Sequence, residues 1–156
     1  MKAKSISISF FLVVFLAQLS SAQTLPTKIK SYLDRNYKGW KLSPSKKDCN
    51  PDVNKGFVSG DFNGDRKLDF AVKFTKNKKG YILAFLKIKN NFKAFVLHDY
   101  DADEAKYSSL GIWKKGETFE YEGKSLRLKY DAPSDYHCES DVGGIHYYRN
   151  GKFVGY

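Results

Sequence analysis

Five residues of one short segment could supply oxygen ligands to a cation. Asp61, Asn63, Asp65 and Asp69 place side-chain oxygens at positions 1, 3, 5 and 9 of this segment, and Lys67 offers its backbone carbonyl between them. Ca²⁺ takes about six to eight oxygen ligands, and a tight loop with ligands at alternate positions can wrap around it. Three carboxylates brought together without a cation would repel one another. The spacing therefore predicts a Ca²⁺ site, with water completing the coordination.

A turn without an ion remains the alternative for this segment. Asp, Asn and Gly all favour tight turns, and Arg66 could neutralise the carboxylates itself. Val72 stands where an EF-hand loop has its bidentate Glu, so the affinity for Ca²⁺ is expected to be modest, about 10⁻⁴ to 10⁻³ M. An ion bound so weakly would stabilise the structure rather than act as a signal.

Residues 60–72, with the sequence GDFNGDRKLDFAV, resemble the calcium loop of FG-GAP (VCBS-type) repeats, which occur in integrin-like propellers and in secreted bacterial proteins. The resemblance implies that the Asp and Asn positions bind Ca²⁺ between two strands and that a strand begins at Phe70. Arg66 departs from the pattern, because this family usually has Gly there. The chain has one copy of the motif, so the seven-bladed assembly and its ligand face do not carry over.

The three histidines form no recognisable metal or catalytic motif. His98, His137 and His146 lack the His-x-x-x-His spacing of zinc enzymes, and neither a Gly-x-Ser-x-Gly elbow nor a phosphate-binding loop occurs. An acid–base site that pairs His98 or His146 with a carboxylate remains open, since only the fold could assemble it. A second acidic run is expected to be a solvated loop; it comprises Asp99, Asp101, Asp103 and Glu104.

Residues 1–22 have the pattern of a cleaved secretory signal peptide. Lys2 and Lys4 precede an apolar run over residues 6–19, and small residues follow at 20–22. The apolar run is shorter than the roughly 20 residues of a membrane-spanning helix. The mature chain, residues 23–156, is expected to be periplasmic or secreted, with no membrane span. In that oxidising setting the two cysteines predict a structural disulfide, Cys49–Cys138.

The charge of the chain bears on its partners. Lys and Arg number 27 against 17 Asp and Glu, a net charge of +10, and removal of the signal peptide leaves about +8. Most lysines fall in turns or at alternate strand positions, which is typical of solvated faces. The other interpretation is a basic surface for an anionic partner, either an acidic polysaccharide or a protein of the cell envelope. Nucleic acid is not an expected partner outside the cytoplasm.

The chain has the length of one domain, and its pattern predicts an α+β fold. An amphipathic helix is expected over residues 24–39, packed on a mostly antiparallel β-meander with one disulfide. Residues 68–75 alternate, with four apolar side chains on one face and Asp69, Ala71, Lys73 and Thr75 on the other. Asn150-Gly151 predicts a tight hairpin, and residues 132–135 are expected to separate two strands. Strands are expected at residues 68–75, 81–89, 92–97, 109–113, 118–121, 125–130, 145–148 and 152–156.

The sequence favours binding over catalysis. We expect an exported monomer with a structural Ca²⁺ loop at Asp61–Asp69 that engages an anionic polymer or protein of the envelope. A periplasmic immunity or inhibitor protein that docks on a toxin or hydrolase suits the same features. A hydrolase with a site assembled across strands is the third possibility.

Overall fold

The computed structural model describes residues 24–45, 56–140 and 142–156. Strands hold 55% of these residues and helix 8%, so the predicted α+β class is wrong and the fold is mostly β. The predicted signal peptide lies outside the described residues. Cys49 lies outside them as well, so the structure does not describe the predicted Cys49–Cys138 bond. Among the described residues, no helix is long and apolar enough to cross a membrane.

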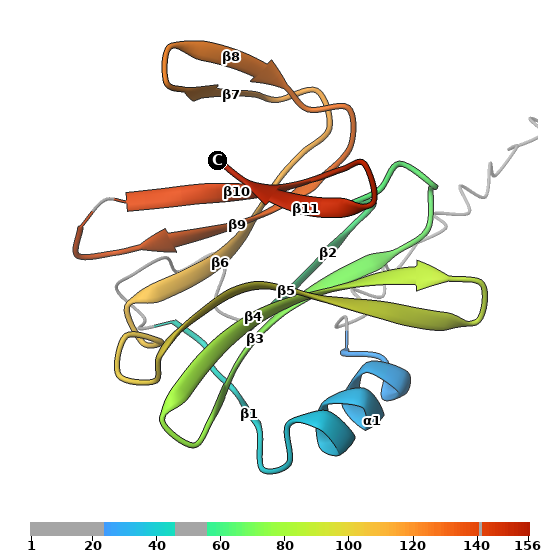
Figure 1. Cartoon of the computed structure of the whole chain (residues 1–156), viewed down its shortest axis with the longest axis vertical. Coiled ribbons are helices and arrows are strands. Elements are labelled where there is room, and N and C mark those ends of the chain that lie inside the picture. Colours follow the sequence, from blue (N-terminus) through green and yellow to red (C-terminus); the bar gives the residue numbers. More distant parts are fainter. Residues whose placement is uncertain (1–23, 46–55, 141) are drawn as a thin grey trace, which may run out of the picture.

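The first sheet has five antiparallel strands and lies in the lower half of Figure 1. It contains β1 (Lys41–Leu42), β2 (Phe57–Gly60), β3 (Asp69–Lys76), β4 (Lys79–Ile88) and β5 (Asn91–Asp101). β3, β4 and β5 follow one another as a meander, while β1 and β2 both pair with the free edge of β3. The predicted meander is therefore one part of a larger arrangement.

The second sheet has four strands in the order β11-β10-β9-β6 and lies across the first in Figure 1. A two-stranded ribbon, β7 with β8, projects from it, because the chain leaves the sheet after β6 and returns to pair β9 with β6. The strands are β6 (Ser108–Trp113), β7 (Thr118–Tyr121), β8 (Lys124–Arg127), β9 (Ala132–His137), β10 (Val142–Arg149) and β11 (Lys152–Gly155).

The one helix of the described residues, α1 (Thr27–Asn36), is shorter than predicted. Ile29 and Leu33 are fully buried against the outer face of the first sheet, as the spacing of apolar residues predicted. Pro26 stands at the N-cap, where its missing N–H costs no helical hydrogen bond. The helix therefore covers one face of the first sheet (Figure 1).

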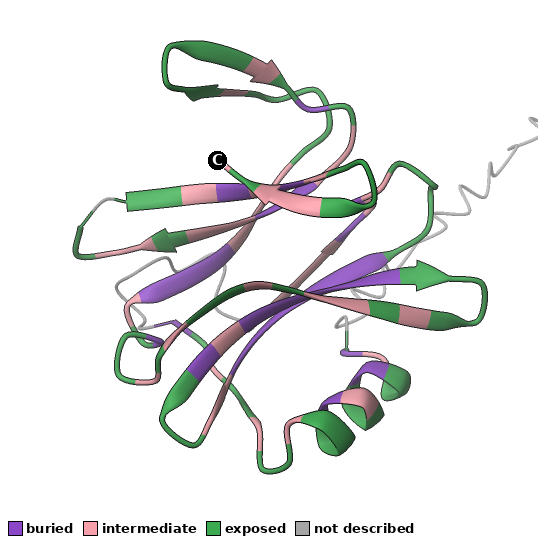
Figure 2. Ribbon diagram, viewed as in Figure 1, coloured by how far each residue is buried: buried purple, intermediate pink, exposed green. Residues whose placement is uncertain are grey.

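β3 is buried on both faces, which the alternation of its residues did not predict. Phe70, Val72 and Phe74 pack with α1, whereas Ala71 packs on the opposite face with residues of the second sheet. Lys73 on that opposite face is fully buried too. Figure 2 shows the resulting buried band along the middle of β3 and β4. The second sheet covers the face that was expected to meet water.

The list of expected strands lacked β1, β2 and β9, and of these three β9 matters most to the second sheet. Residues 132–135 were expected to be a turn because they include Pro133, which cannot donate a backbone hydrogen bond. Pro133 is tolerated because it pairs only with Ile112 of β6, and pairing with β10 begins one residue later, at Ser134. A strand therefore runs where the turn was expected, and it carries Asp135 into the centre of the second sheet.

Candidate functional site

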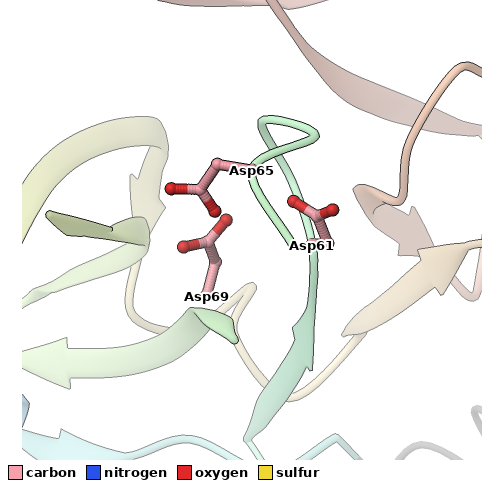
Figure 3. A group of neighbouring side chains, drawn as sticks. All are labelled: Asp61, Asp65 and Asp69. Carbon is pink, nitrogen blue, oxygen red and sulfur yellow. The ribbon is translucent and has the colours of Figure 1, made fainter. Parts of the chain in front are cut away.

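The predicted calcium loop connects β2 to β3. Gly60 and Asp69 are paired across these antiparallel strands, so both ends of the loop lie side by side. Asp61, Asp65 and Asp69 converge, and one oxygen of each lies within 4.8 Å of the others (Figure 3). The structure thus brings together the three carboxylates that the sequence proposed as ligands.

Side chains of the loop hold its own backbone in place. Asp61 Oδ1 accepts the Gly64 N–H at 2.8 Å, and Asp61 Oδ2 accepts the Arg66 N–H at 3.0 Å. Asn63 Oδ1 accepts the Asp65 N–H at 3.0 Å. These bonds satisfy backbone donors that the eight-residue connection, residues 61–68, would otherwise leave to water. The loop is therefore ordered by the same oxygens that were proposed to bind the ion.

The ion-free alternative proposed that Arg66 neutralises the carboxylates, but Arg66 does not pair with them. It is exposed, and in the described part of the chain it forms no ion pair. Its φ of 62° lies in the left-handed region that favours Gly, which is the residue that the resemblance expects there. Lys67 is the nearby cation instead, with Nζ 2.8 Å from Asp65 Oδ2. The hydrogen bond from Lys67 holds the pKa of Asp65 below its ordinary value.

Asp69 is the buried member of the cluster, with no solvent-exposed surface. Its two oxygens accept the N–H groups of Phe62, at 2.9 Å, and of Lys87, at 2.7 Å. Burial, with a smaller contribution from the charges of Asp65 and Asp61, raises the pKa of Asp69 to about 6, against the opposing effect of these two hydrogen bonds. A nearby cation would favour the ionised form of this carboxyl group.

The loop is also bonded to the second sheet through Asp131, the residue before β9. Asp61 N–H donates to Asp131 Oδ2 at 3.3 Å, and Asp131 N–H donates to the Asp61 carbonyl at 3.0 Å. Asp131 Oδ1 accepts the Lys115 N–H at 3.0 Å. Gly60 allows this approach, because a Cβ there would lie 2.5 Å from Asp131 Oδ2.

A second cluster of titratable groups joins three strands, and it pairs both His98 and His146 with a carboxylate, the arrangement that the sequence left open. His98 of β5 places Nδ1 2.8 Å from Asp135 Oδ2, and His146 of β10 places Nε2 2.9 Å from Asp135 Oδ1. Burial pushes the pKa of Asp135 upward, but the hydrogen bonds from His146 and His98 outweigh it and hold the pKa below its ordinary value. Asp135 is therefore an ionised carboxylate that orients two imidazoles.

This cluster lies in the wall of a cavity of about 460 Å³. The cavity also borders the first half of β10, residues 155 and 156, and the turn after β5. Its other lining residues include Leu97, Tyr100, Glu104, Tyr121, Tyr136 and Tyr156. The sequence named the two histidines but not their carboxylate, because Asp135 lies in the unrecognised strand β9. Tyr136, an aromatic residue between two polar ones, was the only local sign of a strand.

A groove of about 560 Å³ lies between α1 and the β4–β5 turn, and its cationic residues are Lys28, Arg35 and Lys89. No carboxylate is among the residues that line it; the others are Thr27, Ser31, Ile88, Asn90 and Asn91. Lys28 Nζ donates to the carbonyl of Asn90, which connects the helix to the turn. We refer to this feature as the basic groove.

The second acidic run is only partly a loop. Asp99 and Asp101 are exposed residues of β5, while Asp103 and Glu104 lie in the turn that follows. Asp101 forms an ion pair with Lys79 at 3.0 Å.

Comparisons of the chain with protein families, with curated proteins and with solved structures found no match.

Proposed function

We propose that the protein is an exported, non-enzymatic binding protein that engages an anionic polymer or protein of the cell envelope through the basic groove, with Ca²⁺ stabilising the loop at residues 61–69. The observation that carries the proposal is the basic groove itself, where Lys28, Arg35 and Lys89 line one hollow and no carboxylate is among its described lining residues. Export rests on the pattern of residues 1–22.

The electrostatics of the groove favour an extended polyanion. Cations that lie within a Debye length of one another, about 8 Å at physiological salt, add their potentials at a shared anionic group. The hollow between helix and turn concentrates this field more than a flat surface would. Since such surface contacts are screened by salt, the binding is expected to be reversible and salt-dependent.

The proposed Ca²⁺ site rests on the donor set of the loop. Each carboxylate oxygen has two lone pairs, so an oxygen that accepts an N–H bond can still face a cation. A bound Ca²⁺ would offset the mutual repulsion of Asp61, Asp65 and Asp69. Asn63 and the Lys67 carbonyl would complete the protein ligands, and the Lys67 ammonium would give up its contact with Asp65.

Binding to a soluble acidic polysaccharide, polygalacturonate, tests the groove. We expect the mature protein to bind it by titration calorimetry and to lose about tenfold or more in affinity when salt rises from about 50 to 200 mM. Replacing Lys28, Arg35 and Lys89 together by Gln should weaken the binding strongly at constant salt.

The matched control removes the same charges elsewhere. Lys115, Lys124 and Arg127 are exposed residues on and beside the β7–β8 ribbon, far from α1 in Figure 1. Their replacement by Gln should change the affinity much less. Equal losses in the two triple variants would mean that only net charge matters, and the basic groove would then not be the binding site.

Thermal melting with Ca²⁺ and with chelator tests the loop. At about 10 mM Ca²⁺, an affinity of about 10⁻⁴ to 10⁻³ M stabilises the fold by about 1.4 to 2.7 kcal/mol, which is a rise of roughly 3 to 10 °C. Asp65→Asn should reduce this rise, and Lys67→Met should increase it because the competing ammonium is gone. Asp103→Asn, outside the loop, is the control. An unchanged rise in Asp65→Asn would place the ion elsewhere, and no rise in the unaltered protein would remove the proposed ion altogether.

A further inference from the structure

The cavity at Asp135 has an acidic lining, whereas the molecule as a whole is basic. The sequence carries 27 Lys and Arg residues, yet none of those that the structure describes lines this cavity. Its ionisable lining residues are two acids, Asp135 and Glu104, the three histidines and several tyrosines. The exposed carboxylates of Asp99 and Asp103 flank the same end of β5. The lining of this cavity is therefore acidic in a protein that is basic overall.

The hydrogen bonds of Asp135 leave its negative charge in place. An ionised carboxylate only accepts hydrogen bonds, so His98 must carry its proton on Nδ1 and His146 must carry its proton on Nε2. Neutral imidazoles donate these bonds without adding charge. When both imidazoles are neutral, the cluster of three residues has a net charge of −1, and Glu104 adds a second negative charge to the wall.

The same protonation pattern leaves an acceptor available to a ligand. With Nδ1–H bonded to Asp135, the Nε2 atom of His98 keeps a lone pair, and the His98 side chain is 50% exposed. His146 is nearly enclosed, at 11% exposed, so it fixes the carboxylate rather than offering a contact. Among the described residues, Asp135 is the hydrogen-bond partner of both imidazoles, and no Ser, Thr or Cys side chain is hydrogen-bonded to either. This arrangement favours a binding site over a hydrolytic one.

The remaining wall suits a small apolar body. Tyr100, Tyr121, Tyr136 and Tyr156 contribute aromatic rings, and Leu97 and Val142 contribute aliphatic surface. Tyrosine rings attract cations through their faces, and the attraction grows when water is excluded. A volume of about 460 Å³ lies within the range of small-molecule sites.

We propose that this cavity binds a small organic cation, a protonated amine on a short aromatic or alkyl body, with the ammonium between Asp135, Glu104 and His98 Nε2 and the body against the tyrosines. The inference goes beyond the proposed function, because it concerns another part of the molecule and a ligand of opposite charge. The basic groove and the loop at residues 61–69 take no part in it.

Three probes of one shape and different charge test the proposal: benzylamine, benzyl alcohol and benzoate. In titrations of the mature protein followed by NMR, we expect benzylamine to shift the signals of His98 and to saturate with a dissociation constant on the order of 1 mM, as befits a fragment. Benzyl alcohol should bind at least about fivefold more weakly, and benzoate weakest of all. Equal binding of the three, preference for benzoate, or no saturable binding of benzylamine would each overturn the proposal.

Substitutions of the two acidic lining residues test which carboxylate binds the ammonium group of the probe. Asp135→Asn and Glu104→Gln keep size and should each weaken benzylamine binding by about fivefold or more, with benzyl alcohol little affected. Asp101→Asn, an exposed acid outside the lining, is the control and should leave all three probes unchanged. If Asp135→Asn fails to fold, Glu104→Gln and His98→Gln carry the test. Benzylamine binding that is unchanged in Glu104→Gln and His98→Gln would overturn it. Failure here leaves polygalacturonate binding untouched, so the two proposals are tested separately.

Discussion

Lys73 carries an ammonium group into the space between the two sheets, where it has no solvent-exposed surface. Its Nζ donates to Ser45 Oγ at 3.2 Å, to the Ala105 carbonyl at 3.0 Å and to the Ser108 carbonyl. Burial lowers the pKa of Lys73 from 10.5 to about 8. One side chain thus ties β3 to the segment before β6 and to the segment after β1.

The lowered pKa of Lys73 predicts a dependence of stability on pH. Between about pH 8 and 10.5 the unfolded chain binds more protons at this lysine than the folded chain does, so the free energy of unfolding should rise with pH. Denaturant titrations at about pH 7 and pH 9.5 should show a gain of about 1 to 2 kcal/mol from this group. Lys73→Met should lack this gain, and exposed Lys30→Met should keep it. An equal gain in Lys73→Met would assign the effect to other groups.

At the residue scale, the features that could be predicted from the sequence are those that depend on the spacing of nearby residues. The convergence of Asp61, Asp65 and Asp69 follows from side chains that bond to backbone N–H groups a few residues away, so a short segment contains the whole cause. The burial of Lys73 could not be predicted in that way. On an isolated strand its face should meet water, and only the distant second sheet buries it.

The β4–β5 hairpin depends on one glycine. Gly80 is paired with Tyr100 across the two strands, and a Cβ on Gly80 would lie 2.2 Å from Tyr100 Cε2. The tyrosine ring lies over the glycine, where any side chain would displace it. The ring in turn lines the cavity at Asp135. The position of a cavity wall therefore depends on a residue that has no side chain.

Gly80→Ala should destabilise the protein by about 1 to 3 kcal/mol in urea unfolding, because the added methyl group collides with the ring. Tyr100→Leu in the same chain should restore part of the loss. Gly155→Ala is the control, since no atom lies within 4 Å of the added Cβ. A loss in Gly80→Ala no larger than that in Gly155→Ala would mean that the ring moves aside freely.

At the element scale, strands with alternating residues or a tight turn were predicted well. The Asn150-Gly151 turn was confirmed, with φ values of 52° and 81° at its two residues. β9 was missed because Pro133 signals a turn locally, whereas its effect on a sheet depends on which neighbours are present at that position. The element most important to the Asp135 cluster was thus the one that local propensity concealed.

The two sheets are joined by the contact between Asp61 and Asp131. Asp131→Ala should leave the Asp61 and Lys115 N–H groups without their protein acceptor and destabilise the fold by about 2 kcal/mol. Equilibrium unfolding in urea would measure the loss. Asp103→Ala, an exposed acid in a turn, is the control and should change stability little. Losses of equal size in the two variants would mean that the contact between Asp61 and Asp131 does not contribute to the free energy of unfolding.

At the scale of the whole molecule, the order of the sheets was not predictable from local pattern. β6 and β9 are neighbours although the β7–β8 ribbon lies between them in the chain, and β1 and β2 share one edge of β3. Such pairings depend on contacts between residues far apart in sequence. The predicted helix on an antiparallel meander is wrong as a description of this fold, because it leaves out the second sheet, which completes the core.

The contact at Asp131 has a consequence for how the molecule opens. β9 starts immediately after Asp131 and carries Asp135 four residues along, about 13 Å away in an extended strand. The aspartate loop and the cavity wall are therefore parts of one cooperative unit, and backbone amides in both should exchange with deuterium at closely similar rates.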